Sequence, residues 1–371
     1  MEDERGPVGP AEVTLAQAAA RIAAASDVLL TCHRRPDGDS VGSLVALATL
    51  LRARGKRATL YNPDPVPRRL KWLPLGRNFR RKLARTIRYQ VTVVTDCADR
   101  ALLGRTFPPP EVTGTVVVLD HHPHGTPFGD IYLCDPEAAS TGVLVARMAR
   151  HLGWPLDPDA ALGLYVSLCS DTGTFRYANT NAEALRLAAE LVELGVDPWQ
   201  VAETLYERSS MGRYRLLAEA LGSLRLVCAG RVAIMTITAD MVERASATWD
   251  DSVDLVSYTR ALDGVECGVL ITPSRGGGVR VSLRTKGGVD AGQVCAGFGG
   301  GGHRGAAGCI LSGDLAAAAA RIEAVLGEAL GESMPAPAPA PPASDAATAD
   351  VVTSVRDDEP RHGASPEKPL P

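Results

Sequence analysis

The sequence predicts an α/β protein with an N-terminal doubly wound parallel sheet, followed by a smaller C-terminal α/β domain. Three apolar runs, Asp27–Cys32, Gln90–Thr95 and Gly114–Leu119, have the character of buried strands and alternate with segments of helical periodicity. Each run is followed at once by aspartate or histidine. Because ligands of open parallel sheets bind beyond the carboxyl ends of the strands, we expect these polar residues to gather at one edge of the sheet.

Length and composition fit a globular protein of two domains. The chain has 371 residues, of which 45% are hydrophobic, and no run approaches the roughly 18 apolar residues of a membrane span. The acidic first residues, MEDERGPVGP, do not have the character of a signal peptide. The eight cysteines are spread singly, without a CxxC pair. We therefore expect reduced cysteines, a cytoplasmic location and no contact with a membrane.

The negative charge is concentrated at the C-terminus. From Gly331 onward there are seven acidic and three basic residues, which accounts for the whole net charge of −4. Residues 1–330 are thus neutral overall, which argues against a binder of duplex DNA. The tail is also rich in proline and alanine and cannot bury a core, so we expect disorder there.

The segments between these landmarks give an order of elements and domain boundaries. We expect further strands at 57–61, 231–238, 264–272 and 278–285, and helices at 13–25, 41–54, 139–152, 159–168, 181–195, 197–208, 213–227, 251–262, 289–298 and 314–330. The Gly299–Gly302 run is expected to open a short Ala/Gly helix. The predicted parts are a disordered leader (1–12), a catalytic domain (13–195), a helical linker (196–222), a substrate-binding domain (223–330) and the disordered tail (331–371).

One segment is unusually basic. Nine lysine and arginine residues lie between Arg68 and Arg88, and no acidic residue interrupts them. Such a segment either draws a polyanionic substrate toward the site or forms the solvated face of a helix. The sequence favours the solvated face.

The polar residues after the three strands, together with Asp171 in an acidic turn after the helix expected at 159–168, suit a pair of divalent metal ions. They are His33, Asp37, Asp39, Asp96, Asp99, Asp120, His121, His122 and Asp171. Carboxylates gathered this closely would repel one another unless cations neutralised them. Carboxylates mixed with imidazoles, without thiolates, favour Mn²⁺, with Mg²⁺ as the alternative. Two such ions about 3.5–4 Å apart would bridge a hydroxide and hold a phosphate, which predicts hydrolysis of a phosphoester.

The Gly-rich run has a use of its own. Glycines let backbone N–H groups converge on an anion, and a helix that follows them would add its positive N-terminal end. His303 could then hydrogen-bond a phosphate, and Arg284 could pair with one through two hydrogen bonds. The alternative is a packing turn where backbones approach closely. Asp99 is expected to be a helix N-cap, and His124 is expected to be solvated.

Five motifs, in order, resemble the DHH phosphoesterase superfamily and its C-terminal DHHA1 domain. They are HRRPDGDSVGS, VTDCAD, VVLDHHP, SDTGTF and GGGGHRGAAG, and together they span roughly residues 13–330. The chain is most similar to the branch of nano-RNases and pAp phosphatases, where pAp is 3′-phosphoadenosine 5′-phosphate. The resemblance implies oligoribonuclease activity that releases AMP and other 5′-mononucleotides. It also implies activity on pApA or cyclic di-AMP, and a homodimer formed through the N-terminal domain.

The resemblance also implies roles for single residues. His33, Asp37 and Asp96 would hold one Mn²⁺, and Asp39, Asp96, His121 and Asp171 the other, so that Asp96 bridges the two. His122 would contact the phosphoryl oxygens or the leaving group, and Asp120 would orient an imidazole. Arg284, Gly300, Gly301, Gly302 and His303 would bind the substrate from a second domain that faces the metals across a cleft.

Two other functions are compatible with parts of the pattern. A manganese pyrophosphatase shares the four N-terminal motifs, but it grips pyrophosphate with a basic C-terminal cluster where this chain has GGGGH. A non-enzymatic nucleotide- or RNA-binding regulator could keep the fold and lose turnover. The intact set of acidic residues and histidines argues against the regulator. Long-strand exonucleases of the superfamily are disfavoured, because the sequence has no additional single-strand-binding domain.

Overall fold

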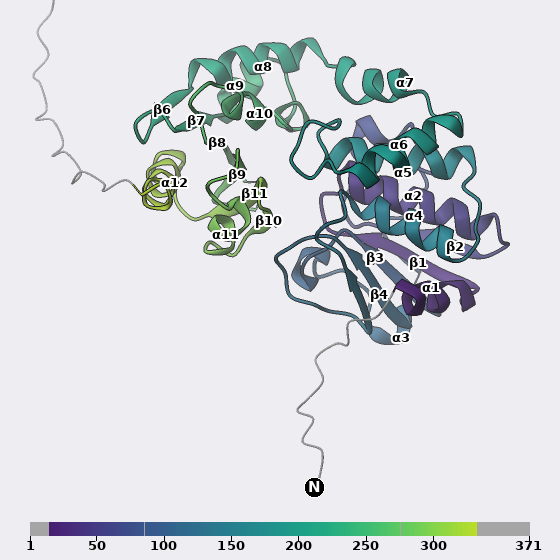
Figure 1. The fold of residues 1–371 in the computed structure, drawn as a ribbon. Helices are drawn as coiled ribbons and strands as arrows, with labels where there is room; N and C mark the ends of the chain where they lie inside the picture. Colours follow the sequence, from purple (N-terminus) through teal and green to yellow (C-terminus); the bar gives the residue numbers. More distant parts are fainter. Residues whose placement is uncertain (1–14, 85, 275, 332–371) are drawn as a thin grey trace, which may run out of the picture. The chain divides into compact units, whose positions relative to one another are not determined.

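A computed structural model describes residues 15–84, 86–274 and 276–331, so the predicted leader and all but Gly331 of the predicted tail lie outside the described residues. The N-terminal part confirms the predicted parallel α/β fold (Figure 1). Its strands are β1 (Asp27–Cys32), β2 (Arg57–Leu60), β3 (Val91–Thr95), β4 (Thr115–Asp120) and β5 (Ile131–Cys134). They pair in the order β2-β1-β3-β4-β5, and every pair is parallel.

The two faces of this sheet are covered differently. The helices of this part are α1 (Leu15–Ala24), α2 (Gly38–Arg52), α3 (Pro110–Thr113), α4 (Thr141–His151), α5 (Pro158–Asp171) and α6 (Ala182–Glu193), with short 3₁₀ helices η1 (Arg68–Leu70) and η2 (Arg100–Leu103). On one face, Val28 and Leu30 of β1 share a buried core with α1, α2, α4 and α5. On the other face, Leu29 packs with Tyr61 and Tyr89. This explains why β1 is apolar at almost every position.

Helix α2 carries the first predicted motif and is held tightly against α5. Asp37 caps the helix by accepting a hydrogen bond from the backbone N–H of Ser40 (3.0 Å), and the Ser40 hydroxyl accepts one from the N–H of Asp37 (3.0 Å). Where the two helices cross, a Cβ atom added at Gly42 would lie 2.4 Å from the carbonyl oxygen of Gly163. Glycine at this position therefore lets α2 and α5 approach, which sets the position of Asp39.

The close helix crossing gives a prediction about stability. Gly42→Ala should lower the free energy of unfolding by about 1–3 kcal/mol, because the new methyl group meets backbone atoms that cannot move aside. Urea denaturation of the metal-free protein measures the change. Gly222→Ala is the matched control, because a Cβ atom there meets nothing within 4 Å. Equal stability of the Gly42→Ala variant and the native chain would contradict the packing argument.

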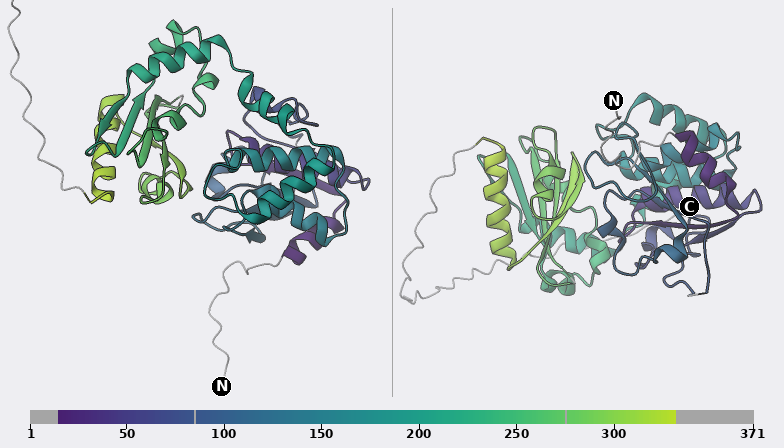
Figure 2. Two further views of the ribbon diagram at one scale, coloured as in Figure 1. Left: turned by 45° about the horizontal axis from the view of Figure 1, so that its top comes forward. Right: turned by 90° about the horizontal axis from the view of Figure 1, so that it is seen from below.

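The C-terminal part begins with helical segments and continues into a mixed sheet. The helical segments are α7 (Pro198–Ala202), the π-helical η3 (Glu203–Glu207), α8 (Met211–Gly222), α9 (Ala239–Arg244), η4 (Trp249–Ser252), α10 (Val256–Arg260), α11 (Ala291–Ala296) and α12 (Leu315–Ala329). The strands are β6 (Arg225–Val227), β7 (Val232–Thr236), β8 (Cys267–Pro273), β9 (Val279–Thr285), β10 (Gly301–His303) and β11 (Ala306–Leu311). Their order is β10-β11-β9-β8-β7-β6, and within it only β7 and β8 are parallel. Helix α12 packs against β7, β8 and β9 (Figure 2).

The structure departs from the expectations for this part, and it contains one strand of the N-terminal sheet that was not expected. The Gly-rich run does not open a helix, because residues 301–303 form β10 and pair antiparallel with β11. Burial alternates along β11, with Ala307, Cys309 and Leu311 inward, so the Ala/Gly composition hides a strand pattern. The predicted helix 213–227 ends at Gly222 and is followed by β6. Strand β5 was not predicted, since its four residues are all only partly buried.

No helix among the described residues is long and apolar enough to cross a membrane.

Candidate metal centre

The structure brings the predicted polar residues together at the carboxyl edge of the first sheet. They come from the ends of β1, β3 and β4, from the first turn of α2 and from the last residue of α5 (Figure 1). Their ligand atoms form close groups, two of which are His33–Asp37–Asp96 and Asp39–His121–Asp171. Within each of these groups the ligand atoms lie within 4.8 Å of one another. The two carboxylates of the first motif therefore belong to different groups.

The first group is centred on His33. Its Nε2 atom lies 3.4 Å from Oδ2 of Asp96 and 3.9 Å from Oδ1 of Asp37. Its Nδ1 atom is 2.7 Å from the carbonyl oxygen of Arg34, which fixes Nδ1 as the donor and leaves Nε2 as the atom that can bind a cation. Asp37 keeps its helix cap while it faces His33, so capping and metal binding are compatible roles for this residue.

The second group surrounds His121. Its Nδ1 donates to the carbonyl oxygen of Ala138 (2.9 Å), and its Nε2 faces Oδ2 of Asp39 (3.4 Å) and of Asp171 (3.5 Å). Oδ1 of Asp96 lies 3.8 Å from the same nitrogen. Nε2 is buried and has no hydrogen-bond partner among the described residues. A buried nitrogen with a free lone pair, facing three carboxylates, fits a divalent cation.

Asp39 is rigidly held. It is fully buried and accepts hydrogen bonds from the backbone N–H groups of Thr141 (2.8 Å) and Gly142 (3.3 Å). The hydroxyls of Ser43 (3.1 Å) and Ser167 also donate to it. A carboxylate with this many donors keeps its orientation, as a metal ligand requires.

The electrostatics of the centre also call for a cation. Burial raises the pKa of Asp171 to about 8, and the carboxylates of Asp39, Asp96 and Asp37 add to the effect against His121. Burial likewise raises the pKa of Asp96, with help from Asp39. Burial opposes the charged form of His33, but Asp37 and Asp96 raise its pKa well above the usual value. Without metal, protons therefore take the place of the missing positive charge.

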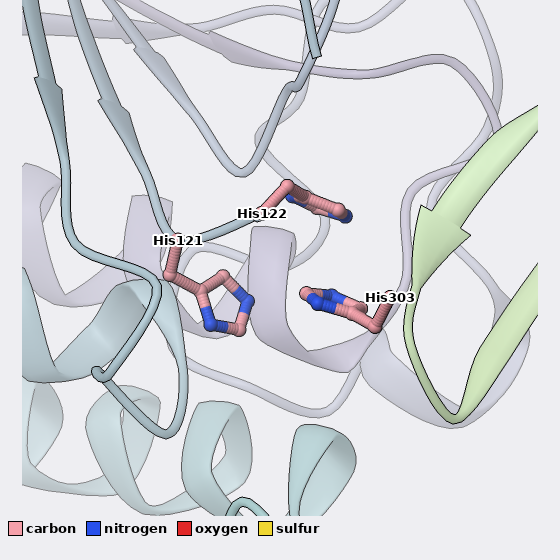
Figure 3. Close-up of side chains that lie close together, drawn as sticks. All are labelled: His121, His122 and His303. Atoms are coloured by element: carbon pink, nitrogen blue, oxygen red, sulfur yellow. The ribbon is translucent and has the colours of Figure 1, made fainter. Parts of the chain in front are cut away.

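His122 lies beside the two groups and is oriented by Asp120. Nδ1 of His122 is 2.8 Å from Oδ1 of Asp120, and the other carboxylate oxygen, Oδ2, accepts a hydrogen bond from the Tyr132 hydroxyl (3.3 Å). Burial opposes protonation of His122, but Asp120 raises its pKa overall. The ring of His303 stacks on that of His122 with centroids 4.0 Å apart, and its centroid lies 4.6 Å from that of His121 (Figure 3). His303 is thus in contact with the predicted catalytic residues.

The Gly-rich run leads into β10, the first strand of a β-hairpin with β11, and β10 ends at His303. A Cβ atom added at Gly300 would lie 2.3 Å from the carbonyl oxygen of Gly308. One added at Gly302, whose φ is +142°, would lie 2.5 Å from the carbonyl oxygen of Ala306. Both glycines are therefore required by close packing, while a Cβ at Gly301 meets nothing within 4 Å. The helix dipole expected after this run is absent, because a strand follows, so any anion site here depends on backbone N–H groups and side chains alone.

Arg284 lies on β9, where its register partner on β11 is Ala306. Burial lowers the pKa of its guanidinium, while Asp254, Tyr177 and Asp171 act in the opposite direction. A partly buried guanidinium of this kind is suited to pairing with a phosphate.

Several contributors could not be identified from the sequence. Ser167 and Tyr132 orient Asp39 and Asp120, and Asp254 pairs with Arg69 at 2.7 Å. His124 was expected to be solvated, but its Nε2 lies 3.1 Å from Oδ2 of Asp290. These partners are far apart in sequence, so no local spacing points to them. Asp99 was predicted correctly as a cap, since it accepts a hydrogen bond from the N–H of Ala101 (2.7 Å).

Comparison with known proteins agrees with this arrangement. Residues 27–168 match the DHH family, N-terminal domain, and residues 230–328 match the DHHA1 domain. The chain is 34% identical over 286 residues to the bifunctional oligoribonuclease and PAP phosphatase NrnA of Thermus thermophilus, covering 77% of this chain and 84% of the relative. It is 26% identical to the protein of the same name from Bacillus subtilis, covering 76% of this chain and 89% of the relative.

The fold also matches a solved structure. An exopolyphosphatase-related protein from Bacteroides fragilis superimposes with a TM-score of 0.77 at 23% identity, covering 86% of this chain and 97% of that one. Together, the two matched domains and the relative from Thermus thermophilus show that the chain belongs to the DHH family of phosphoesterases, with a C-terminal DHHA1 domain.

Proposed function

We propose that this chain hydrolyses short oligoribonucleotides, including pApA, and pAp, releasing AMP and other 5′-mononucleotides with the help of two divalent cations. The observation that carries the proposal is the pair of His/carboxylate groups on either side of Asp96, with His303 in contact with His122. The relatives named for oligoribonuclease and PAP phosphatase activity support the choice of substrate. Cyclic di-AMP is a further substrate within this proposal.

The metal ligands we propose follow the two groups. His33, Asp37 and Asp96 would hold one ion, and Asp39, Asp96, His121 and Asp171 the other. When bound, the two ions would neutralise the phosphate and lower the pKa of the attacking water. Imidazole together with carboxylate favours Mn²⁺ over Mg²⁺.

The other residues act on the phosphate and the leaving group. Asp120 holds the His122 ring through Nδ1, so that Nε2 is the atom available to the substrate. The raised pKa of His122 keeps this ring protonated to higher pH, which lets it donate a proton or hydrogen bond to a departing oxygen. His303 and Arg284 would bind a second phosphate or the distal nucleotide, together with N–H groups of the 300–302 backbone.

The division of the first motif between two ions is testable. Asp39→Asn should lower the affinity for the second ion by roughly 10- to 100-fold and the affinity for the first ion far less, because the substitution removes a charge from only one group. Asp37→Asn is the matched variant and should show the opposite pattern. Electron paramagnetic resonance of free Mn²⁺ during titration measures both affinities. If both variants lower the affinity for the same ion, the assignment of Asp37 and Asp39 to different ions is wrong.

A substrate panel ranks this function against its alternatives. Product chromatography with pAp, pApA, cyclic di-AMP and pyrophosphate, in Mn²⁺ and in Mg²⁺, should show AMP from the nucleotides and slow or no cleavage of pyrophosphate. Rapid cleavage of pyrophosphate without nucleotide cleavage would favour the pyrophosphatase. Tight binding of pApA without AMP would favour the non-enzymatic regulator.

A further inference from the structure

The basic segment Arg68–Arg88 is not used by the site described so far. Its apolar residues turn inward: Leu70 and Leu73 are buried, and Trp72, Leu75 and Phe79 pack against the main core. Five of its cations, which we call the basic face, are exposed and form no salt bridge with any described residue: Arg68, Lys71, Arg77, Arg80 and Lys82. An ordinary solvated surface would mix acidic residues among them, but none occurs between Asp64 and Asp96.

The basic face is attached directly to the loop that carries the first motif. Arg80 pairs with the extension of β2, since its N–H donates to the carbonyl oxygen of Leu60 (2.9 Å) and its carbonyl accepts from the N–H of Asn62 (3.1 Å). The side chain of Asn62 donates in turn to the carbonyl oxygen of His33 (2.9 Å). Asn62 therefore links Arg80 through hydrogen bonds to a predicted metal ligand, at the carboxyl edge of the sheet where ligands bind.

Two further contacts keep this connection rigid. Asp64 pairs with the Arg34 guanidinium (3.1 Å) and accepts a hydrogen bond from the N–H of Arg35 (3.0 Å). The Arg81 guanidinium donates to the carbonyl oxygen of Pro63 (3.2 Å). Arg69 of the same segment is paired with the carboxylate of Asp254. Asp64 and Asp254 are therefore paired with other cations, and neither forms a salt bridge with the five cations of the basic face.

We propose that the basic face binds the phosphate backbone of a single-stranded oligoribonucleotide beyond the nucleotides held at the metal centre, and so favours longer substrates. This inference rests on the proposed function. Phosphate binding needs only exposed cations, whereas a protein partner normally needs apolar or aromatic anchors. The aromatic residues Trp72 and Phe79 pack inward, which disfavours a protein partner and also disfavours stacking of the RNA bases on this surface.

Two double variants, each with two cations of the basic face replaced by glutamine, test this inference. Arg80→Gln with Lys82→Gln, and separately Arg68→Gln with Arg77→Gln, remove two charges each from side chains that make no hydrogen bond to described residues. Arg186→Gln with Arg215→Gln is the control, with two exposed cations that lie outside the segment. Fluorescence anisotropy with a labelled oligoadenylate of about ten nucleotides, in chelator, measures binding independently of catalysis.

We expect roughly tenfold weaker binding at low salt for each basic-face variant, and a plot of log affinity against log salt whose slope is shallower by about 1.4. Turnover of pApA should stay within about twofold of the native chain, because the basic face is proposed to bind nucleotides beyond the two held at the metal centre. The control variant should bind like the native chain.

Unchanged oligoadenylate binding in both basic-face variants would overturn the inference. Equal loss in the control would also overturn it, and so would equally tight binding of a polyglutamate of the same charge, which would mark a general polyanion or acidic-protein surface. Failure of the native chain to cleave pApA would count against the proposed function, while the binding measurement would still decide the basic face.

Discussion

Asp96→Ala is expected to reduce the turnover of pApA by roughly 1,000-fold or more while the fold is kept. Asp96 is the carboxylate that faces both histidines, with 3.4 Å to Nε2 of His33 and 3.8 Å to Nε2 of His121. Losing it removes a ligand from both proposed ions at once. The measurement is the rate of AMP release in saturating Mn²⁺, with circular dichroism to confirm folding.

Asp159→Asn provides the control for this prediction, because Asp159 is an exposed aspartate in the first turn of α5. It should retain nearly full activity. The metal-free Asp96→Ala protein should be at least as stable as the native chain, since burial and Asp39 raise the pKa of Asp96 and make its charge unfavourable. An Asp96→Ala enzyme with more than a tenth of native activity would contradict the shared-ligand assignment.

The second large expected effect is that Mn²⁺ stabilises the folded protein, by an amount that depends on pH. The pKa of Asp171 is about 8 in the fold and roughly 4 in an unfolded chain, so the folded protein binds more protons between these values. The metal-free protein should therefore lose stability as pH rises from about 4 to 8, and the raised pKa of His33 acts in the same direction at higher pH. Mn²⁺ at about 1,000 times its Kd should add about 4 kcal/mol per site, an increase in Tm on the order of 10 °C.

Thermal denaturation at pH 6 and pH 8, with and without Mn²⁺, measures this effect. The gain from Mn²⁺ should be larger at pH 8, where fewer protons compete for the ligands. Asp171→Asn should flatten the pH dependence of the metal-free protein and lose most of the gain attributed to the second ion. The increase in Tm caused by Mn²⁺ could instead be the same at both pH values, or could be retained in full by the Asp171→Asn variant. Either result would show that Asp171 is not a ligand.

The sequence was sufficient to predict the features of the fold that depend on local pattern. Strands β1, β3 and β4 are buried at almost every position and rich in apolar residues, so the apolar runs at 27–32, 90–95 and 114–119 predicted their positions to within one residue. Strand β5 lacks that signal, because it is four residues long and partly exposed. The hairpin of β10 and β11 was mistaken for a helix, because alternation of small residues gives little contrast in hydrophobicity.

The contacts that orient the centre could not be predicted in the same way. Ser167 lies on α5 and reaches Asp39 only because Gly42 and Gly163 let two helices approach closely. Tyr132 reaches Asp120 only because β5 pairs with β4. Such partners depend on tertiary packing, whereas the candidate ligands other than Asp171 follow directly from the ends of the strands.

Hydrolysis of pApA in water enriched in heavy oxygen tests the central claim most directly. If two ions activate water at this centre for attack on phosphorus, incubation with Mn²⁺ should release AMP, and mass spectrometry should find one heavy oxygen in the 5′-phosphate of the AMP that carried the cleaved bond. Intact pApA after prolonged incubation with Mn²⁺, or AMP without heavy oxygen, would contradict the proposed function.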